Sequence, residues 1–191
     1  MEKNNLDIII QSRRAIYPRQ FSGEKLSKNI IIRILENGNM APSHKLTQPW
    51  VFKIFQGLSK IKLANEMIKS YSKTTKNDSF LKSKEKKILS NCNLSECIIA
   101  ICMKRDPKKS IPEWEELAST SMAVQNMWLS CASYNVGCYW STPKYSINMS
   151  KFLSLKKNEK CLGFFYMGKF NHKKQKKTKR DQINKKIKWF N

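Results

Sequence analysis

The chain has 191 residues, and 40% of them are hydrophobic, which excludes an intrinsically disordered protein and allows one domain with a sizeable core. Its formal net charge is +23, and lysine supplies nearly all of the excess because only six arginines occur. Lysines scattered in this way are typical of a solvated surface. We therefore expect salt-sensitive adhesion to polyanions and no specific nucleic-acid function.

The sequence shows no membrane segment and no metal site. The longest apolar runs, 97–103 and 162–167, have the length of strands and are too short to cross a bilayer. The first residues carry early charge and lack the layout of a signal peptide, so we expect a cytoplasmic protein without membrane association. The six cysteines form no Cys-x-x-Cys pair, and only two histidines accompany them, which indicates packed thiols rather than zinc ligands.

Two helices are predicted before the first strand. The first covers 4–16 and ends before Pro18, which cannot continue a helix. The second covers 26–38, with Ser27 as its N-cap and Gly38 suited to its C-terminal cap. Its apolar stripe consists of Ile30, Ile31, Ile34 and Leu35.

The middle of the chain alternates strands with polar segments. A loop bounded by prolines leads into a strand over 50–55, which is rich in aromatic and β-branched residues. Residues 58–90 have thin helical periodicity, which predicts two exposed helices with a mobile joint near 73–78. Residues 97–104 form a continuous apolar run and are predicted as a buried strand.

The second half begins with the strongest predicted helix, over 112–135, with a proline at its start. A short strand over 137–142, a short helix over 147–155 and a core strand over 160–170 follow, and 171–191 forms a basic tail. Helices and strands in this order predict an α+β sandwich. The apolar stripe of the long helix contains Trp114, Leu117, Met122, Gln125, Trp128, Leu129 and Ala132.

Four segments together resemble the nitroreductase family of FMN-dependent oxidoreductases. They are SRRAIYPRQF (12–21), APSHKLTQPWVF (41–52), the helix and strand over 111–142, and CLGFFYMGKF (161–170). Each motif alone is modest, but the four stand in the family's order and span most of the chain. The His-Lys form of the loop is similar to that of the small single-domain NAD(P)H nitroreductases.

The resemblance implies a nitroreductase-like sandwich with a central mixed or antiparallel sheet flanked by helices, in an interlocked homodimer. It implies one FMN-binding domain over 1–191, with 171–191 as a basic C-terminal extension. NAD(P)H would reduce the flavin at N5, and the same site would then pass two electrons to a nitroaromatic, quinone or related acceptor. The flavin carries this reactivity, so no catalytic acid, base or nucleophile is expected.

The resemblance also implies where FMN would bind. Arg13 and Arg14 are a rare arginine pair in this lysine-rich chain, and with Ala15 they match the family's phosphate and ribityl contacts. Alanine replaces the usual small polar residue, which removes one hydrogen bond. In the tail, Arg180 is the matching candidate to close over the phosphate. Without the resemblance, ordinary surface charge would explain the pair, and a disordered cationic tail would explain Arg180.

The loop after the second predicted helix matches a segment that crosses the dimer interface. The resemblance makes His44 a contact to the flavin of the other subunit, with Met40 nearby at the end of the helix. Gln48 would fix the loop backbone or reach the isoalloxazine edge. Pro42 and the proline before the strand stiffen the loop. Taken without the resemblance, His44 would be a solvent-exposed loop residue.

The strand over 137–142 matches the wall beside the isoalloxazine ring. Trp140 offers an aromatic face, and the backbone and hydroxyls of Ser141 and Thr142 can satisfy ring heteroatoms. The similar subfamily often has arginine at the position of Ser141, so the charge preference for substrates stays open. A plain core role for the Trp140 side chain is the alternative.

Two other functions remain compatible with the sequence. One is a flavin-binding storage or sensing protein without turnover, and the other is a basic nucleic-acid-binding protein. The latter lacks a recognisable binding motif and lacks aromatic residues interleaved with arginine. The segment 58–90 is a candidate lid.

Overall fold

The computed structural model describes residues 4–74, 78–171 and 179–190. Its α-helices are α1 (Asn5–Ser12), α2 (Lys28–Asn39), α3 (Ser59–Ser72), α4 (Asp78–Leu94) and α5 (Glu113–Ser133). Its strands are β1 (Trp50–Phe55), β2 (Cys97–Lys104), β3 (Val136–Ser141) and β4 (Glu159–Lys169). Short 3₁₀ helices cover Pro18–Gln20, His44–Leu46, Lys144–Met149 and Ile183–Lys186.

The strands form one antiparallel sheet in the order β1-β2-β4-β3. The central strands β2 and β4 are almost wholly buried, which explains why their sequences are continuous apolar runs rather than alternating ones. The predicted α+β sandwich with a flanked, antiparallel sheet is therefore confirmed.

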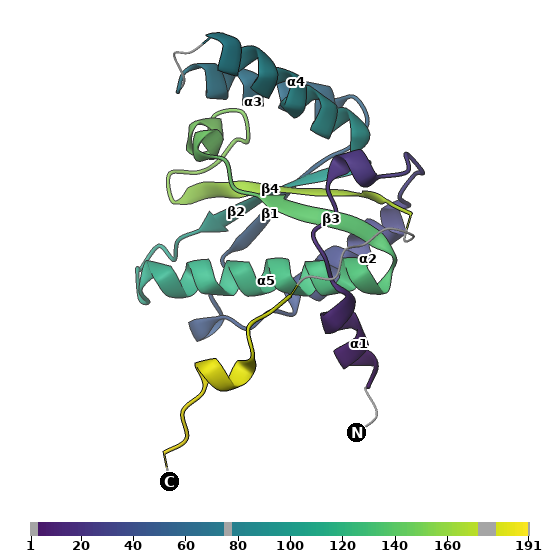
Figure 1. Ribbon diagram of the computed structural model, residues 1–191. Coiled ribbons are helices and arrows are strands. Elements are labelled where there is room, and N and C mark those ends of the chain that lie inside the picture. Colours follow the sequence, from purple (N-terminus) through teal and green to yellow (C-terminus); the bar gives the residue numbers. More distant parts are fainter. Residues whose placement is uncertain (1–3, 75–77, 172–178, 191) are drawn as a thin grey trace.

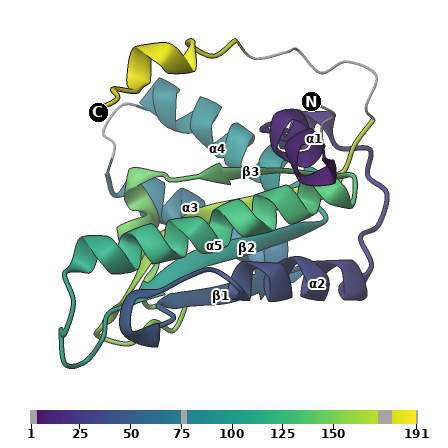
Figure 2. The same cartoon turned by 90° about the horizontal axis from the view of Figure 1, so that it is seen from below.

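Helices cover both faces of this sheet (Figures 1 and 2). One face, with Phe164 and Tyr166, packs on α3 and α4, and the opposite face, with Phe165 and Met167, packs on α2 and α5. Neighbouring residues of β4 thus belong to different cores, as the two-residue period of a strand requires. No helix of the described residues is long and apolar enough to cross a membrane.

The predicted stripe of α5 is wrong in its first half, whereas Trp128 near the C-terminal end is partly buried and packs against the core. Trp114, Leu117 and Met122 lie on the exposed side of the helix, with Trp114 67% exposed. The buried side carries Glu116, Ser119, Thr120, Ala123, Val124, Met127, Ser130 and Cys131. Most of these are small residues that let α5 approach α2 and the sheet closely, so Trp114, Leu117 and Met122 turn outward.

Gly38 also serves this close approach and does not form the predicted cap. It lies inside α2, whose C-cap is Met40, and an added Cβ would come 2.7 Å from the Met127 side chain. The predicted N-cap is confirmed, because the Ser27 side chain accepts a hydrogen bond from the Ile30 N–H at 3.3 Å.

Three other predictions need correction. The two helices within 58–90 exist, but α3 is not an exposed helix, since it buries Leu63, Met67 and Tyr71. The predicted joint between them lies partly outside the described residues. The first helix ends at Ser12 rather than at residue 16, because the chain turns extended there to reach β3. Residues 147–155 are not one α-helix, since the first three end the 3₁₀ helix Lys144–Met149 and the next five form turns.

Candidate functional site

The segment Arg13–Ile16 is held between β3 and α5. Arg13 has extended rather than helical dihedral angles, and the Ile16 N–H donates to the Cys138 carbonyl at 2.9 Å. On the other side, the indole N–H of Trp128 donates to the Arg14 carbonyl at 3.1 Å. The backbone of the predicted phosphate segment is therefore attached to two rigid elements, while Ala15 is exposed.

Three arginines gather at this segment. The Arg13 guanidinium lies over the Trp128 ring, 4.7 Å from its centroid. Partial burial lowers the pKa of Arg13, the charges of Arg14 and Arg180 lower it further, and Cys138 opposes them. Arg180 therefore lies close enough for its charge to act on Arg13. None of the three arginines pairs with a carboxylate among the described residues.

A small cavity of about 220 Å³ opens beside these cations. Arg13, Arg14, Trp128 and Cys138 contribute to its walls. Arg14 donates to the carbonyls of Gln11 and Arg13. A concave site whose guanidinium groups have no carboxylate partner among the described residues is suited to a bound anion, because guanidinium matches the geometry of phosphate oxygens.

The end of β3 carries the predicted ring wall. Trp140 packs against the core beneath α2 and α5, and its buried indole N–H has no hydrogen-bond partner among the described residues. Ser141 is partly buried, and Thr142 is exposed. Gly163 supports this turn, since its φ is +138° and a Cβ there would come 2.2 Å from the Ser141 carbonyl oxygen. Trp140 lies two residues, or about 7 Å, along the strand from Cys138.

The loop with His44 lies at the other end of α5. The His44 Nδ1 is 2.5 Å from the Glu115 Oε2 in the first turn of that helix. Lys45, Leu46 and Gln48 all have left-handed backbone angles, with φ between 41° and 52°. Such a run holds the loop in a defined shape against α5 rather than in a regular turn.

The loop residues do not all point to one place. His44 lines a shallow hollow with residues of α5, whereas Gln48 lines a different hollow beside α2 and β1. Met40 is strongly exposed at the end of α2. Within one chain, therefore, Gln48 does not join the other predicted site residues.

Within one chain, His44 also lies far from the arginine cluster. His44 contacts Glu115 and Arg13 contacts Trp128, and these two α5 residues are 13 positions apart. At 1.5 Å per residue the separation along the helix is about 20 Å. The predicted site thus falls into two groups, one at each end of α5.

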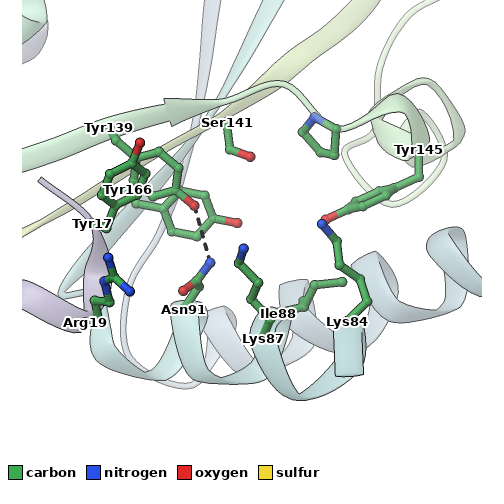
Figure 3. Close-up of a pocket in the computed structure, with 11 residues that line it drawn as sticks. Tyr17, Arg19, Lys84, Lys87, Ile88, Asn91, Tyr139, Ser141, Tyr145 and Tyr166 are labelled. Atoms are coloured by element: carbon green, nitrogen blue, oxygen red, sulfur yellow. Dashed lines mark hydrogen bonds between the residues drawn. The ribbon is translucent and has the colours of Figure 1, made fainter. Parts of the chain in front are cut away.

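The structure also has a cavity whose lining residues, apart from Ser141, were not predicted from the sequence. Figure 3 shows a cavity between β3 and α4 into which Arg19, Lys84 and Lys87 project, with Tyr139 and Ser141 on the strand side. The available signals were the helical spacing of Lys84, Lys87 and Asn91 and the alternation of Tyr139 with Trp140.

Comparison with known proteins identifies the family. The sequence profile described as the nitroreductase family matches residues 10–169. The chain belongs to the nitroreductase family. "Putative NAD(P)H nitroreductase YfhC" of Bacillus subtilis (strain 168) is 26% identical over 163 residues, which cover 84% of this chain and 81% of that protein.

Solved structures of this family share the fold. The nitroreductase-like family protein from Bacillus cereus superposes with a TM-score of 0.85 at 22% identity, covering 100% of this chain and 98% of that chain. A nitroreductase with bound FMN from Bacteroides fragilis NCTC 9343 superposes with a TM-score of 0.74 at 19% identity, covering 99% and 100% of the two chains.

Proposed function

We propose that this nitroreductase-family protein is an FMN-dependent oxidoreductase that uses NAD(P)H to reduce nitroaromatic, quinone or related acceptors. The observation that carries the proposal is the cluster of Arg13, Arg14 and Arg180, which has no carboxylate partner among the described residues. Two similar proteins support it. One is named a putative NAD(P)H nitroreductase, and the other is a nitroreductase with bound FMN.

The chain's residues fit FMN along the outer edge of β3. The arginines would hold the phosphate, and the fixed backbone of Arg13–Ile16 would set the direction of the ribityl chain. Trp140, Ser141 and Thr142 would flank the ring, and the buried Trp140 indole N–H, which has no partner within the described part of the chain, leaves a donor there. Bound FMN would supply two-electron chemistry, while these residues would bind and orient it.

The second part of the proposal is a homodimer that completes each site. His44 and Arg13 lie about 20 Å apart along α5 in one chain. Two α5 helices that pair antiparallel about a two-fold axis would bring the His44 end of one helix to the Arg13 end of the other. The exposed apolar side chains Trp114, Leu117 and Met122 supply the surface for such pairing. Met40 would lie near His44 at this interface.

The axis of that dimer would pass near Met122, because Ser121 and Met122 lie midway between Glu115 and Trp128. We expect Met122→Arg to convert the dimer to a monomer and to lower FMN affinity. Leu94→Arg is the matched control, since Leu94 is 42% exposed and Met122 is 43% exposed. Light scattering of both variants measures the mass. A native protein that binds FMN as a stable monomer would contradict the dimer.

The function itself is tested with the purified protein. We expect FMN to bind the apoprotein in a fluorescence titration and the loaded protein to oxidise NADH or NADPH when a nitroaromatic or quinone is present. Flavin binding without turnover would instead support a storage or sensing protein. A protein that binds no FMN would refute the proposal.

A further inference from the structure

The first turn of α5 carries three glutamates, and each contacts a different element. Glu113 pairs with a lysine of β4, and the fully buried Glu116 pairs with the arginine that follows β2. Glu115 instead meets the loop after α2, where its Oε2 lies 2.5 Å from the His44 Nδ1. Of the three carboxylates, the one of Glu115 therefore acts on a residue of the proposed FMN site.

This contact determines which ring nitrogen of His44 is left for a ligand. A carboxylate only accepts hydrogen bonds, so the His44 Nδ1 carries a hydrogen and donates it to Glu115. The Nε2 atom makes no hydrogen bond within the described residues, and the His44 side chain is 56% exposed. A free imidazole rotates and exchanges its two tautomers, and a carboxylate on one nitrogen removes both freedoms. Glu115 thus presents Nε2 outward in a fixed direction.

The backbone around His44 is held as well. The Lys45 Nζ donates to the Ser110 carbonyl at 3.0 Å, and the Gln48 N–H donates to the Ser43 hydroxyl at 3.2 Å. Lys45 and Gln48 have φ angles of 50° and 41°, which residues other than glycine rarely adopt. Such angles persist because surrounding contacts compensate for them. The loop and the ring are therefore arranged before a ligand arrives, which lowers the entropy cost of binding.

The fixed ring stands on the surface that the partner subunit would cover. His44 and Glu115 line a shallow hollow of about 410 Å³ together with the exposed side chains of Trp114 and Met122. In the proposed antiparallel pairing of the two α5 helices, this end of the helix meets the Arg13 end of its partner. The free Nε2 is then on the side of the other subunit's FMN.

We infer that Glu115 is a positioning residue, which holds the His44 imidazole so that Nε2 meets the FMN of the partner subunit. The inference rests on the proposed function and on its homodimer. Glu115 acts through His44 and need not touch the flavin. A carboxylate that acted on FMN only through its charge would repel the phosphate, so the two roles predict opposite effects when Glu115 is removed.

The test measures FMN affinity by fluorescence titration in Glu115→Ala, Glu115→Gln and Glu113→Ala. Glu113→Ala is the matched control, because both residues lie in the first turn of α5 and both substitutions remove one charge near the helix dipole. We expect Glu115→Ala to weaken FMN binding about fivefold, the effect of one ordinary hydrogen bond. Glu115→Gln should weaken it less, since its amide oxygen still accepts from Nδ1. Tighter FMN binding in Glu115→Ala would overturn the inference.

A double variant separates positioning from a general effect on the fold. In the His44→Ala background there is no ring to hold, so Glu115→Ala should change FMN affinity by less than about twofold. A full fivefold loss in that background would overturn the inference.

Nitrogen NMR of the imidazole provides a readout that does not depend on FMN. The chain has only two histidines, so the His44→Ala variant identifies the His44 signals. At alkaline pH, where imidazole is neutral, the native protein and Glu113→Ala should show the hydrogen on Nδ1, and Glu115→Ala should lose this preference. An unchanged tautomer in Glu115→Ala would overturn the inference.

The outcomes also separate this inference from the proposed function. A native protein that binds no FMN would refute the proposed function and the role of Glu115 with it. Tight FMN binding by the native protein, with equal affinities in Glu115→Ala and Glu113→Ala, would overturn the role of Glu115 alone.

Discussion

Replacing Arg13 with glutamine removes the charge at the centre of the arginine cluster and keeps a polar side chain. In the structure Arg13 is partly buried over Trp128, and its neighbours Arg14 and Arg180 are also cations. A hydrogen bond to a charged group contributes about 1.5–3 kcal/mol. We therefore expect Arg13→Gln to weaken FMN binding about 10- to 150-fold.

Arg33→Gln is the matched control, because Arg33 is exposed on α2 and does not line the cavity of the cluster. Titration of each apoprotein with FMN, followed by flavin fluorescence, gives the affinities. Arg13→Lys should fall between the native protein and Arg13→Gln, since lysine keeps the charge without the planar fork. Equal FMN affinities for Arg13→Gln and Arg33→Gln would refute the assignment of the phosphate to this cluster.

The variant also loses the contact between Arg13 and Trp128. A cation–π pair of this kind contributes about 0.5–1 kcal/mol at an exposed site. We expect a loss of that size in the unfolding free energy of the apoprotein. Denaturant titration without FMN separates this effect from the loss of cofactor affinity. A much larger loss would mean that Arg13 mainly stabilises the fold.

Three other outcomes follow from named contacts. Exchange of subunits between Arg13→Gln and His44→Ala dimers should restore one tight FMN site per heterodimer, because Arg13 and His44 of each site come from different chains. The stoichiometry of an FMN titration measures this. No tight site after demonstrated exchange would place His44 outside the partner's site. Glu116 is fully buried and pairs with Arg105, so Glu116→Gln should lower the unfolding free energy by about 3 kcal/mol in a denaturant titration. Glu113 pairs with Lys160 at the surface, so Glu113→Gln should change the unfolding free energy by less than about 1 kcal/mol. Burial raises the pKa of Cys97 to about 12, so its thiol stays protonated at pH 8. All six cysteines are buried and should react with a thiol reagent only after unfolding. Rapid labelling of the native protein would contradict this.

The strands were predictable because their sequences alone demand burial. Residues 97–104 form an unbroken apolar run, and β2 occupies those residues at the centre of the sheet. The orientation of α5 was not predictable in the same way. Its large residues suggested the core side, but the fold uses its small residues there because Gly38 of α2 brings the helices together. Which face of a helix is buried depends on the shape of its neighbour, and one helical sequence does not contain that information.

The candidate site shows a similar division. The arginine pair was visible because arginine is rare in this chain, and the structure places both residues beside β3 with Arg180 near. The extended backbone of Arg13 was missed because Leu6, Ile9 and Ile10 have helical spacing. That spacing does not reveal that Ile16 pairs with Cys138 and ends the helix early. The separation of His44 from Arg13 is likewise a property of the assembled fold.

The lysines of α4 show why total charge is a poor guide to function in this protein. Lys82 and Lys86 are exposed and do not line the cavity, whereas Lys84 and Lys87 do, although all four lie within two turns of one helix. Lys84 and Lys87 are three positions apart, so both lie on the helix face that covers β3. The two cationic sites flanking that strand also differ in chemistry. Arginines with planar forks match the oxygens of a phosphate in a fixed geometry, while lysines are strongly hydrated and flexible point charges.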